Sequence, residues 1–493
     1  MTIRGGFGLF YNPIEQLVLE QFQAEPPFGG STTVTEGFFN TPFVLQSCAT
    51  PPLSGPCQGN GASGGPGVLP NPFGSILDPP HGTPFDWSIF RPILMFGELQ
   101  PQLRSQYTEQ YNFGIERELF KDTVLSIGYV GSQGHRLLAT HDLSPANAQT
   151  CLDLQNISNL TGDGTLACGP FFGDSSFSVA ANEIPAGVTL HLPYGPQPVV
   201  TGPNPNPITL VGLRPYSSPT CDPTTGNNCP ADGIPVFSSI FAQDTIANSS
   251  YNSLQASLER RLSNGLQFEI AYTYSKSLDD ASSFENALKP ICNGVLNSFS
   301  CNRGYSLFDA RQRLVLSYLW EPPVPKYKGA KGMALDGWAV SGITSFQSGF
   351  PIRMITIDDQ ELENDTSGFE APGRPVENGP VHFVNPRSNN SYYFCPGGAG
   401  AGGCNITDPD LGSLGGPRSI CCGPGINNFD MSVQKALPFT ETIHGEFRAE
   451  FFNIFNHTQF LNPDGNISDG PDFGRVTHTR DPRQIQFAFK LSF

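Results

Sequence analysis

Apolar and polar residues alternate regularly in the last ten residues of the chain, which read QIQFAFKLSF. Ile485, Phe487 and Phe489 fall on one side of this pattern, and Gln484 and Gln486 fall on the other. Because successive side chains of a β-strand point to opposite faces, a period of two predicts a strand with one apolar face. By itself the segment fits a soluble edge strand and a lipid-facing strand equally well, although the termini of soluble proteins are usually polar.

The same alternation recurs along the whole chain, so that about ten strands are predicted. Some neighbouring strands are joined by tight turns, and the Asn264-Gly265 dipeptide in one of them is a strong hairpin signal. The predicted strands are residues 3–11, 107–118, 123–131, 250–262, 266–276, 312–320, 337–350, 428–436, 441–452 and 484–493.

Short and long connections alternate between these strands. The short connections are residues 119–122, 263–265, 321–336 and 437–440, and the long ones are residues 12–105, 132–249, 277–311, 351–427 and 453–483. Short turns at one end and long loops at the other are typical of outer-membrane barrels, and a soluble sandwich has no reason to sort its loops in this way. We therefore predict an all-β fold, an antiparallel transmembrane β-barrel. Residues 1–493 would form one partial domain with extracellular loops and periplasmic turns.

The composition agrees with this fold class. Only 14% of the residues are charged, and the 54 Gly and 46 Pro residues favour turns and loops over helices. No apolar run is long enough for a transmembrane helix, and the net charge of -17 argues against nucleic acid as a partner. Trp320 and Trp338 flank one short connection, so we expect both in an aromatic girdle on the periplasmic side.

The two ends of the chain lead to two further expectations. The first residues do not have the pattern of a secretory signal, so we expect a truncated reading frame or a start that lies upstream. A closed barrel pairs its last strand with its first strand. We therefore expect residues 484–493 to be an open edge or to pair improperly with residues 3–11.

The second face of the predicted strands is polar. In a barrel this face lines the lumen, and a polar lumen implies water, a plug or a substrate path. Pairing among charges of both signs is favoured over a specific role in ligand binding. The residues predicted to face the lumen are Glu109, Glu116, Glu259, Glu269, Asp430, His444, Glu446, Arg448 and Glu450, together with Gln255 and Gln267.

All twelve cysteines lie in the long connections. Local pairs in Gly- and Pro-rich segments are typical of disulfides that staple loops in an oxidising compartment. A metal site is less favoured, because no pair has the C-x2-C spacing and the histidines are scattered. The disulfide candidates are Cys48/Cys57, Cys151/Cys168, Cys221/Cys229, Cys292/Cys301, Cys395/Cys404 and the adjacent Cys421 and Cys422.

No catalytic motif stands out, so we predict that the chain is not an enzyme and needs no cofactor. One acidic cluster in a long loop is a weak candidate for Ca²⁺, which takes several carboxylate oxygens. A solvated loop is favoured, because the cluster lacks the EF-hand spacing and its glycine. The cluster consists of Asp358, Asp359, Glu361, Glu363 and Asp365.

Several motifs resemble the C-terminal barrel of TonB-dependent outer-membrane receptors, in particular the Oar-like branch. The most specific is EFFNIFNH at residues 450–457. Further matches are GYVGSQGH at 128–135, Arg303-Gly304 followed by DARQR at 309–313, Gly349-Phe350-Pro351 and residues 3–11. The resemblance spans nearly the whole chain. It implies a barrel of about 22 strands with an N-terminal plug, of which this chain would form the last ten.

The resemblance also implies a function. Such a receptor would take up or export an unidentified substrate, driven by a periplasmic TonB-type coupling protein. We expect no plug domain and no TonB box within these residues, so the partners would include the missing plug and strands, the coupling protein and outer-membrane lipid. One alternative is a surface-binding or adhesive outer-membrane protein that transports nothing. An outer-membrane enzyme is a third possibility, but no set of catalytic residues can be placed.

Overall fold

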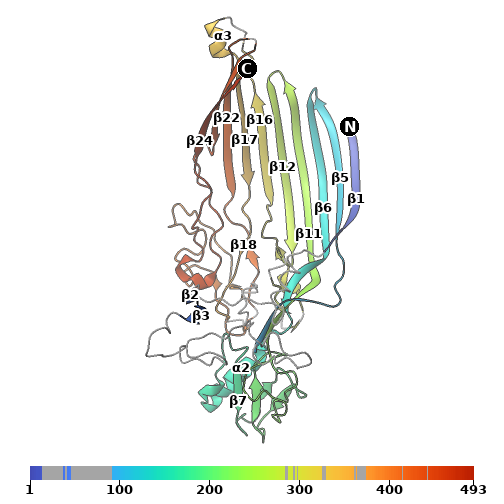
Figure 1. Cartoon of the computed structure of the whole chain (residues 1–493), viewed down its shortest axis with the longest axis vertical. Coiled ribbons are helices and arrows are strands. Elements are labelled where there is room, and N and C mark those ends of the chain that lie inside the picture. Colours follow the sequence, from blue (N-terminus) through green and yellow to red (C-terminus); the bar gives the residue numbers. More distant parts are fainter. Residues whose placement is uncertain are drawn as a thin grey trace.

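Ten strands follow one another across an antiparallel sheet in this computed structural model (Figure 1). The structure describes residues 1–13, 37–38, 41–45, 91–283, 287–292, 295–296, 298–324, 329–359, 362, 373–413, 415–440 and 442–493. In order across the sheet the strands are β1 (Thr2–Asn12), β5 (Gln106–Phe120), β6 (Thr123–Asp142), β11 (Phe237–Ser263), β12 (Leu266–Asp279), β16 (Gln312–Trp320), β17 (Trp338–Gln347), β22 (Ile426–Pro438), β23 (His444–Phe452) and β24 (Gln484–Ser492). Each segment predicted as a strand overlaps one of them.

Two of these strands are much longer than the sequence pattern predicts. β6 continues to Asp142 instead of ending at residue 131, and β11 begins at Phe237 instead of at residue 250. The two extensions pair with each other, for example Phe241 with Asp142. Ala139, Thr140 and His141 are consecutive residues of β6, and all three are buried. The alternation fails here because both faces of the strand extension are covered.

The sheet has two open edges. Among the described strands, β1 pairs only with β5 and β24 pairs only with β23. Of the two arrangements expected for the last strand, the open edge is the one observed. Both termini lie at the end of the sheet that carries the short turns, and the long connections gather at the opposite end (Figure 1).

The connections, long and short, contain short elements where the sequence analysis predicted only loops. The helical elements are α2 (Ala148–Thr161), η4 (Gly164–Leu166), η5 (Ser300–Asn302), α3 (Ala330–Leu335) and η6 (Ile467–Asp472). The short strands are β2 (Gly37–Phe38), β3 (Thr41–Leu45), β4 (Ile93–Leu99), β7 (Ser176–Val179), β8 (Thr189–His191), β9 (Val199–Thr201), β10 (Ile208–Val211), β13 (Ile291–Cys292), β14 (Val295–Leu296), β15 (Gly304–Tyr305), β18 (Ile352–Arg353), β19 (Val376–Glu377), β20 (Ile406–Thr407) and β21 (Ser419–Ile420). None of the described helices is long and apolar enough to cross a membrane.

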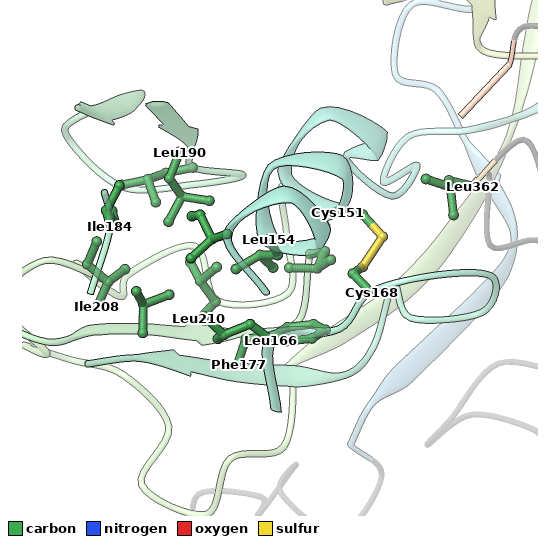
Figure 2. Packing of buried hydrophobic residues seen from close by; sticks show 14 residues of the cluster. Cys151, Leu154, Leu166, Cys168, Phe177, Ile184, Leu190, Ile208, Leu210 and Leu362 are labelled. Atoms are coloured by element: carbon green, nitrogen blue, oxygen red, sulfur yellow. A yellow bond between two sulfur atoms is a disulfide. The ribbon is translucent and has the colours of Figure 1, made fainter. Parts of the chain in front are cut away.

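We call the residues between β6 and β11, 143–236, the second loop. It folds around helix α2, which Asn147 caps by accepting a backbone hydrogen bond at 3.1 Å. Gly162 ends the helix with a φ of 79°, a conformation that favours glycine. Leu154 of α2 is fully buried among residues of β7 and β10, so this loop has a hydrophobic core of its own (Figure 2).

Three of the other long connections join the second loop in one layer, which we call the loop layer. We call residues 280–311 the third loop, residues 348–425 the fourth loop and residues 453–483 the fifth loop. Leu362 of the fourth loop packs into the core of the second loop (Figure 2). Phe394 of the fourth loop meets Phe473 of the fifth loop edge to face at 5.1 Å. The loops therefore support one another instead of projecting independently.

Candidate functional site

The polar residues of the strands gather on one face of the sheet. The register pairs Glu259 with Glu269 and Glu269 with Ser317. It continues from Ser317 to Ile343 and from Ile343 to Asp430. Directly paired residues of antiparallel strands point to the same side, so these five side chains form one row. The residues predicted to face the lumen that lie on this polar face are Glu116, Glu259, Glu269, Asp430, His444, Glu446, Arg448 and Glu450, together with Gln255 and Gln267.

Glu109 is an exception, and its assignment to this face was wrong. The register pairs it with Leu9 on one side and Gln133 on the other. It therefore shares a face with Tyr111, two residues further along β5. Glu116 lies an odd number of residues from Glu109, so the pleat of the strand turns the two carboxylates to opposite faces.

The polar face is hollowed in the middle of the sheet. A cavity of about 450 Å³ is lined by Glu259, Glu269, Asp430 and Glu450. Its lining also takes residues from β16 and β17, so it is bounded by β11, β12, β16, β17, β22 and β23. One cavity can touch six successive strands only if the sheet curves around it. The polar face is therefore concave.

Two further cavities lie on the same face. One of about 460 Å³ is lined by Arg313, Gln347 and Arg480, and it shares Asp430 with the central cavity. β22 runs from the loop end toward the turn end, and this cavity includes the beginning of β22. The cavity therefore lies closer to the loop layer than the central one does. The other, of about 270 Å³, lies between β1 and β12 and is lined by Glu116, among others. The three cavities make the concave face a candidate path for a polar solute.

Charges of both signs pair on part of this face. Arg448 lies 2.8 Å from Glu446 and 3.5 Å from Glu450, and Arg4 lies 3.5 Å from Glu116. The predicted pairing is thus observed on β23 and at the β1 edge.

The centre of the face is different, because three of the acids that line the central cavity, Glu259, Glu269 and Asp430, have no cationic partner among the described residues. The carboxylates of Glu259 and Glu269 form no ion pair with any residue that the structure describes, although they face each other across β11 and β12. Asp430 accepts hydrogen bonds from the backbone N–H of Asn453 at 2.8 Å and from the amide of Asn428 at 3.0 Å. The middle of the concave face is therefore acidic, and among the described donors some hold Asp430 while Arg448 and Gln486 hold Glu450 at its border.

The opposite face of the sheet is apolar and exposed. Phe487 of β24 is 69% exposed, and Phe489 and Leu491 share its face. Trp320 and Trp338 lie on this face at the turn end. The indole N–H of Trp338 donates to the carbonyl of Ala334 at 2.8 Å. An exposed apolar face with tryptophans at one end is what a lipid-facing wall requires.

Disulfides join the cysteines that the structure describes, and all of them lie in the loop layer. They are Cys151–Cys168, Cys221–Cys229, Cys292–Cys301, Cys395–Cys404 and Cys421–Cys422. The first ties the end of η4 to helix α2 (Figure 2). The candidates Cys48 and Cys57 lie outside the described residues.

The acidic cluster is only partly within the described residues. Asp358 accepts a hydrogen bond from the hydroxyl of Thr356 at 2.7 Å. Asp359 instead accepts one from the backbone N–H of Phe171 at 2.8 Å, and so ties the fourth loop to the second loop. Glu361, Glu363 and Asp365 lie outside the described residues, and the described part contains no group of three possible metal ligands. The Ca²⁺ site stays a prediction.

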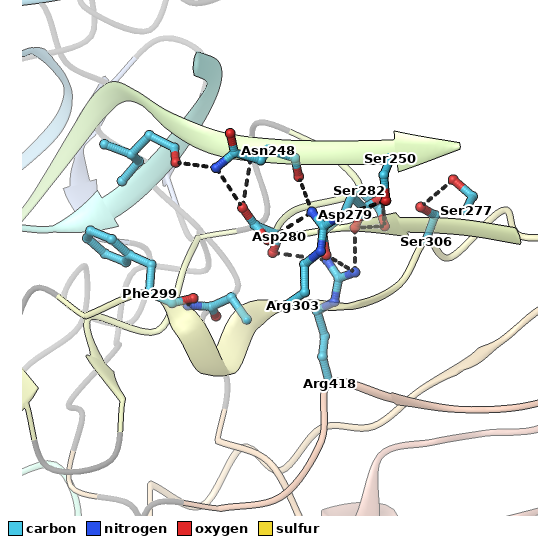
Figure 3. A network of polar contacts seen from close by, with 12 residues as sticks. Asn248, Ser250, Ser277, Asp279, Asp280, Ser282, Phe299, Arg303, Ser306 and Arg418 are labelled. Atoms are coloured by element: carbon cyan, nitrogen blue, oxygen red, sulfur yellow. Dashed lines mark hydrogen bonds and ion pairs between the residues drawn. The ribbon is translucent and has the colours of Figure 1, made fainter. Parts of the chain in front are cut away.

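Polar contacts fasten the third loop to the end of the sheet (Figure 3). Arg303 donates to the carbonyl of Asn248 at 2.9 Å and lies 3.3 Å from the carboxylate of Asp280. Arg418 of the fourth loop forms an ion pair with Asp279 at the end of β12 and donates to the carbonyl of Tyr305 in the third loop at 3.0 Å. Arg303 belongs to a motif singled out in the sequence, and here its role is to hold a loop.

A buried arginine in the second loop could not be recognised from the sequence. The Arg214 side chain is fully buried, and its guanidinium donates to Asp174 at 2.8 Å and to the carbonyl of Ser144 at 2.8 Å. Its second ion pair is with Asp142 at 3.3 Å. Burial raises the pKa of Asp142, and the charge of Arg214 opposes this shift. No local pattern brings these residues together, because they are 40 and 72 positions apart.

The whole arrangement agrees with a sequence comparison. Residues 1–486 match the model of a family described as "Outer membrane beta barrel domain". The chain belongs to this family. It is therefore an outer-membrane protein, and its sheet spans that membrane of a Gram-negative bacterium.

Solved structures with a similar fold include outer-membrane transporters and receptors. For the outer membrane transporter YddB from Escherichia coli the TM-score is 0.36 at 9% identity, covering 82% of this chain and 34% of that one. For the pyoverdine receptor FpvA from Pseudomonas aeruginosa the TM-score is 0.31 at 12% identity, covering 79% of this chain and 30% of that one. For the copper transporter OprC the TM-score is 0.30 at 7% identity, covering 81% of this chain and 34% of that one. The chain thus spans about a third of these proteins. No curated protein matches the sequence.

Proposed function

We propose that the sheet is part of the wall of a TonB-dependent outer-membrane receptor or transporter of the Oar-like branch. One observation carries the proposal: a single cavity of about 450 Å³ on the polar face is bounded by six neighbouring strands. A wall that is hollow and polar on one side and apolar on the other suits a barrel with lipid outside and water inside. The TonB-dependent class and the Oar-like branch rest on sequence motifs such as EFFNIFNH at residues 450–457.

The open edges support a larger barrel. A strand edge in a membrane leaves backbone N–H and C=O groups without partners, and a closed barrel removes such edges. β1 and β24 run in opposite directions, so an even number of further strands must lie between them. In our proposal about twelve further strands complete a barrel of about 22 strands, and a longer protein supplies them together with a plug domain.

The sidedness of the wall follows from its two ends. We place the loop layer outside the cell and the short turns in the periplasm, as in other barrels of this kind. The disulfides of the loop layer are compatible with this placement but do not decide it, because the cell surface and the periplasm are both oxidising. A substrate would then meet the loop layer first, pass the cavity lined by Arg313 and Arg480, and reach the acidic central cavity.

Energy for this passage would come from a TonB-type coupling protein in the periplasm, acting on the plug. The substrate is unidentified. Its path along the concave face passes Glu259 and Glu269, which have no cationic partner among the described residues. In a water-filled lumen with low-dielectric walls, such a pair of like charges attracts cations and repels anions.

A second candidate function is a surface-binding or adhesive protein that transports nothing. The loop layer favours it in one respect. The second loop has its own hydrophobic core, with Leu154, Leu190 and Leu210 fully buried, and the Cys151–Cys168 disulfide closes it. Such a unit would present a rigid surface to a partner outside the cell.

Comparison of three bacterial strains separates the two functions: the wild type, a strain without the gene that encodes this chain, and a strain without the coupling protein. All are grown in the same medium, and the depletion of solutes is measured by mass spectrometry. Transport predicts that one or more solutes remain in the medium of both mutants. If both mutants deplete the medium as the wild type does, and only the first attaches less to surfaces, the protein is an adhesin and the transport proposal fails.

A further inference from the structure

A histidine is buried where the third loop meets the extension of the sheet. His141 lies near the end of β6 and is only 5% exposed. Neither ring nitrogen has a hydrogen-bond partner among the residues that the structure describes. The ring instead meets Phe299 of the third loop edge to face, with 5.2 Å between the ring centroids. A buried imidazole without partners is unusual, because buried polar groups are normally hydrogen-bonded.

The same place fastens the third loop. Leu288 donates its backbone N–H to the carbonyl of Thr140 at 2.7 Å, directly beside His141. Leu288 also packs with Ala139 and Ala247, and Phe299 lies against this cluster. The middle of the third loop therefore docks on β6 and β11 through this backbone hydrogen bond and an apolar contact that includes the imidazole.

The surroundings favour the neutral form of His141. Asp244 of β11 is the charged group among the described residues that acts on the ring. Its carboxylate oxygen lies 3.9 Å from Nε2, which is too far for a hydrogen bond. The third loop contributes Leu288 and Phe299 to this contact, neither of which can accept a proton. A second N–H on the ring would be buried without an acceptor.

We propose that His141 is a pH-sensitive latch: its neutral ring holds the third loop on the sheet extension, and protonation releases the loop. Burial lowers the pKa of His141, and the attraction of Asp244 opposes this shift only in part. A histidine with a lowered pKa stabilises the docked state above its ordinary pKa. This stabilisation is lost as the pH falls below about 6.5, and the loss ends at the lower pKa of the docked state.

Release would be confined to the middle of the loop. Arg303 still holds Asn248 and Asp280, and Arg418 still holds Asp279, because arginine remains charged at every relevant pH. In the loop layer outside the cell, the latch would respond to acid in the medium. The inference needs only the docked loop, so it does not depend on whether the protein transports a solute.

The test is hydrogen exchange of the complete protein in detergent, followed by mass spectrometry of peptides from the third loop. Exchange is compared at about pH 7.5 and about pH 5, after correction for the intrinsic rates. The latch predicts that the corrected exchange rate of the peptides that contain Leu288 and Phe299 rises by up to about thirtyfold at the lower pH. In His141→Phe, which keeps an apolar ring in the cluster, this rise should disappear. His191→Phe is the matched control, because His191 lies in the second loop, and it should leave the rise intact.

A second measurement covers the case in which His141→Phe does not fold. Exchange at the imidazole C2 position of the wild-type protein reports the pKa of each histidine separately. The latch predicts a midpoint for His141 below the ordinary value of about 6.5. It also predicts that Asp244→Asn lowers this midpoint further. A midpoint at or above the ordinary value, or an equal rise in third-loop exchange in wild type and His141→Phe, overturns the proposal.

Discussion

At the scale of residues, buried polar groups decide how the second loop is held. Arg214 is fully buried between Asp142 and Asp174, and so it joins the loop to the end of β6. Tyr194 is also buried, and its hydroxyl oxygen accepts a hydrogen bond from the backbone N–H of Val211 in β10. Such contacts are costly to break, because a buried group that loses its partner keeps its desolvation penalty.

Replacement of Arg214 by methionine should loosen the second loop. The substitution leaves the buried carboxylate of Asp142 without its cation, which costs about 3–5 kcal/mol. Amide exchange in peptides of the second loop should accelerate accordingly, while the ten-strand sheet keeps its protection. Arg387→Met is the control, because Arg387 is exposed and its loss should change stability by less than about 0.5 kcal/mol. Equal exchange in both variants would show that the buried ion pairs do not hold the loop.

Tyr194 should make the second loop sensitive to alkali. Burial raises the pKa of Tyr194 to about 12, whereas an unfolded tyrosine titrates near 10. The neutral hydroxyl is thus favoured in the folded loop, and its stabilisation is lost as the pH rises from about 10 to 12. A spectrophotometric titration should show one phenol with a midpoint near 12 that is absent in Tyr194→Phe. If the titration curves of the two proteins have the same shape, Tyr194 is not buried in this way.

At the scale of elements, the sequence predicted the strands well where one face is apolar and the other is polar. β12 is an example, because Phe268, Ile270 and Tyr272 alternate with Glu269 and Ala271 as the pattern requires.

The sequence predicted poorly where tertiary contacts cover both faces of a strand. The extensions of β6 and β11 do not show the alternation for this reason. Helix α2 was missed because its amphipathic pattern is weak and side chains on several of its sides are buried. The Arg214 site and the His141 cluster were missed as well. Both join residues that are far apart in the chain, so no local pattern marks them.

The turn between β11 and β12 tests this account of local structure. Gly265 has a φ of 75°, and a Cβ atom there would collide with the carbonyl oxygen of Glu321 in the neighbouring connection. Gly265→Ala should therefore destabilise the hairpin by about 1–3 kcal/mol. Gly202→Ala is the matched control, because Gly202 has a φ of 72° and open space around it. The positive φ strains an alanine at either position, so the thermal midpoint should fall more in Gly265→Ala than in Gly202→Ala, and equal decreases would contradict the collision.

At the scale of the whole molecule, two faces and two ends define the protein. The concave face is polar and carries three cavities, and the opposite face exposes side chains such as Phe487. The loop layer lies at one end, and both termini lie at the other (Figure 1). Trp320 and Trp338 flank a short connection at that second end. The net charge of -17 fits a surface in contact with water outside the lipid. The family match over residues 1–486 shows that this wall belongs to an outer-membrane barrel.

The central claim is that the two faces of the sheet meet different solvents. Ile270 and Ala271 are adjacent in β12 and point to opposite faces. A tryptophan is introduced at one position at a time, the protein is reconstituted into bilayers, and its fluorescence is compared with that of the parent protein. Brominated lipid should quench Ile270→Trp and leave Ala271→Trp bright, whereas iodide in the water should do the reverse. If brominated lipid quenches both tryptophans equally, the polar face does not line a lumen and the account of the wall is wrong.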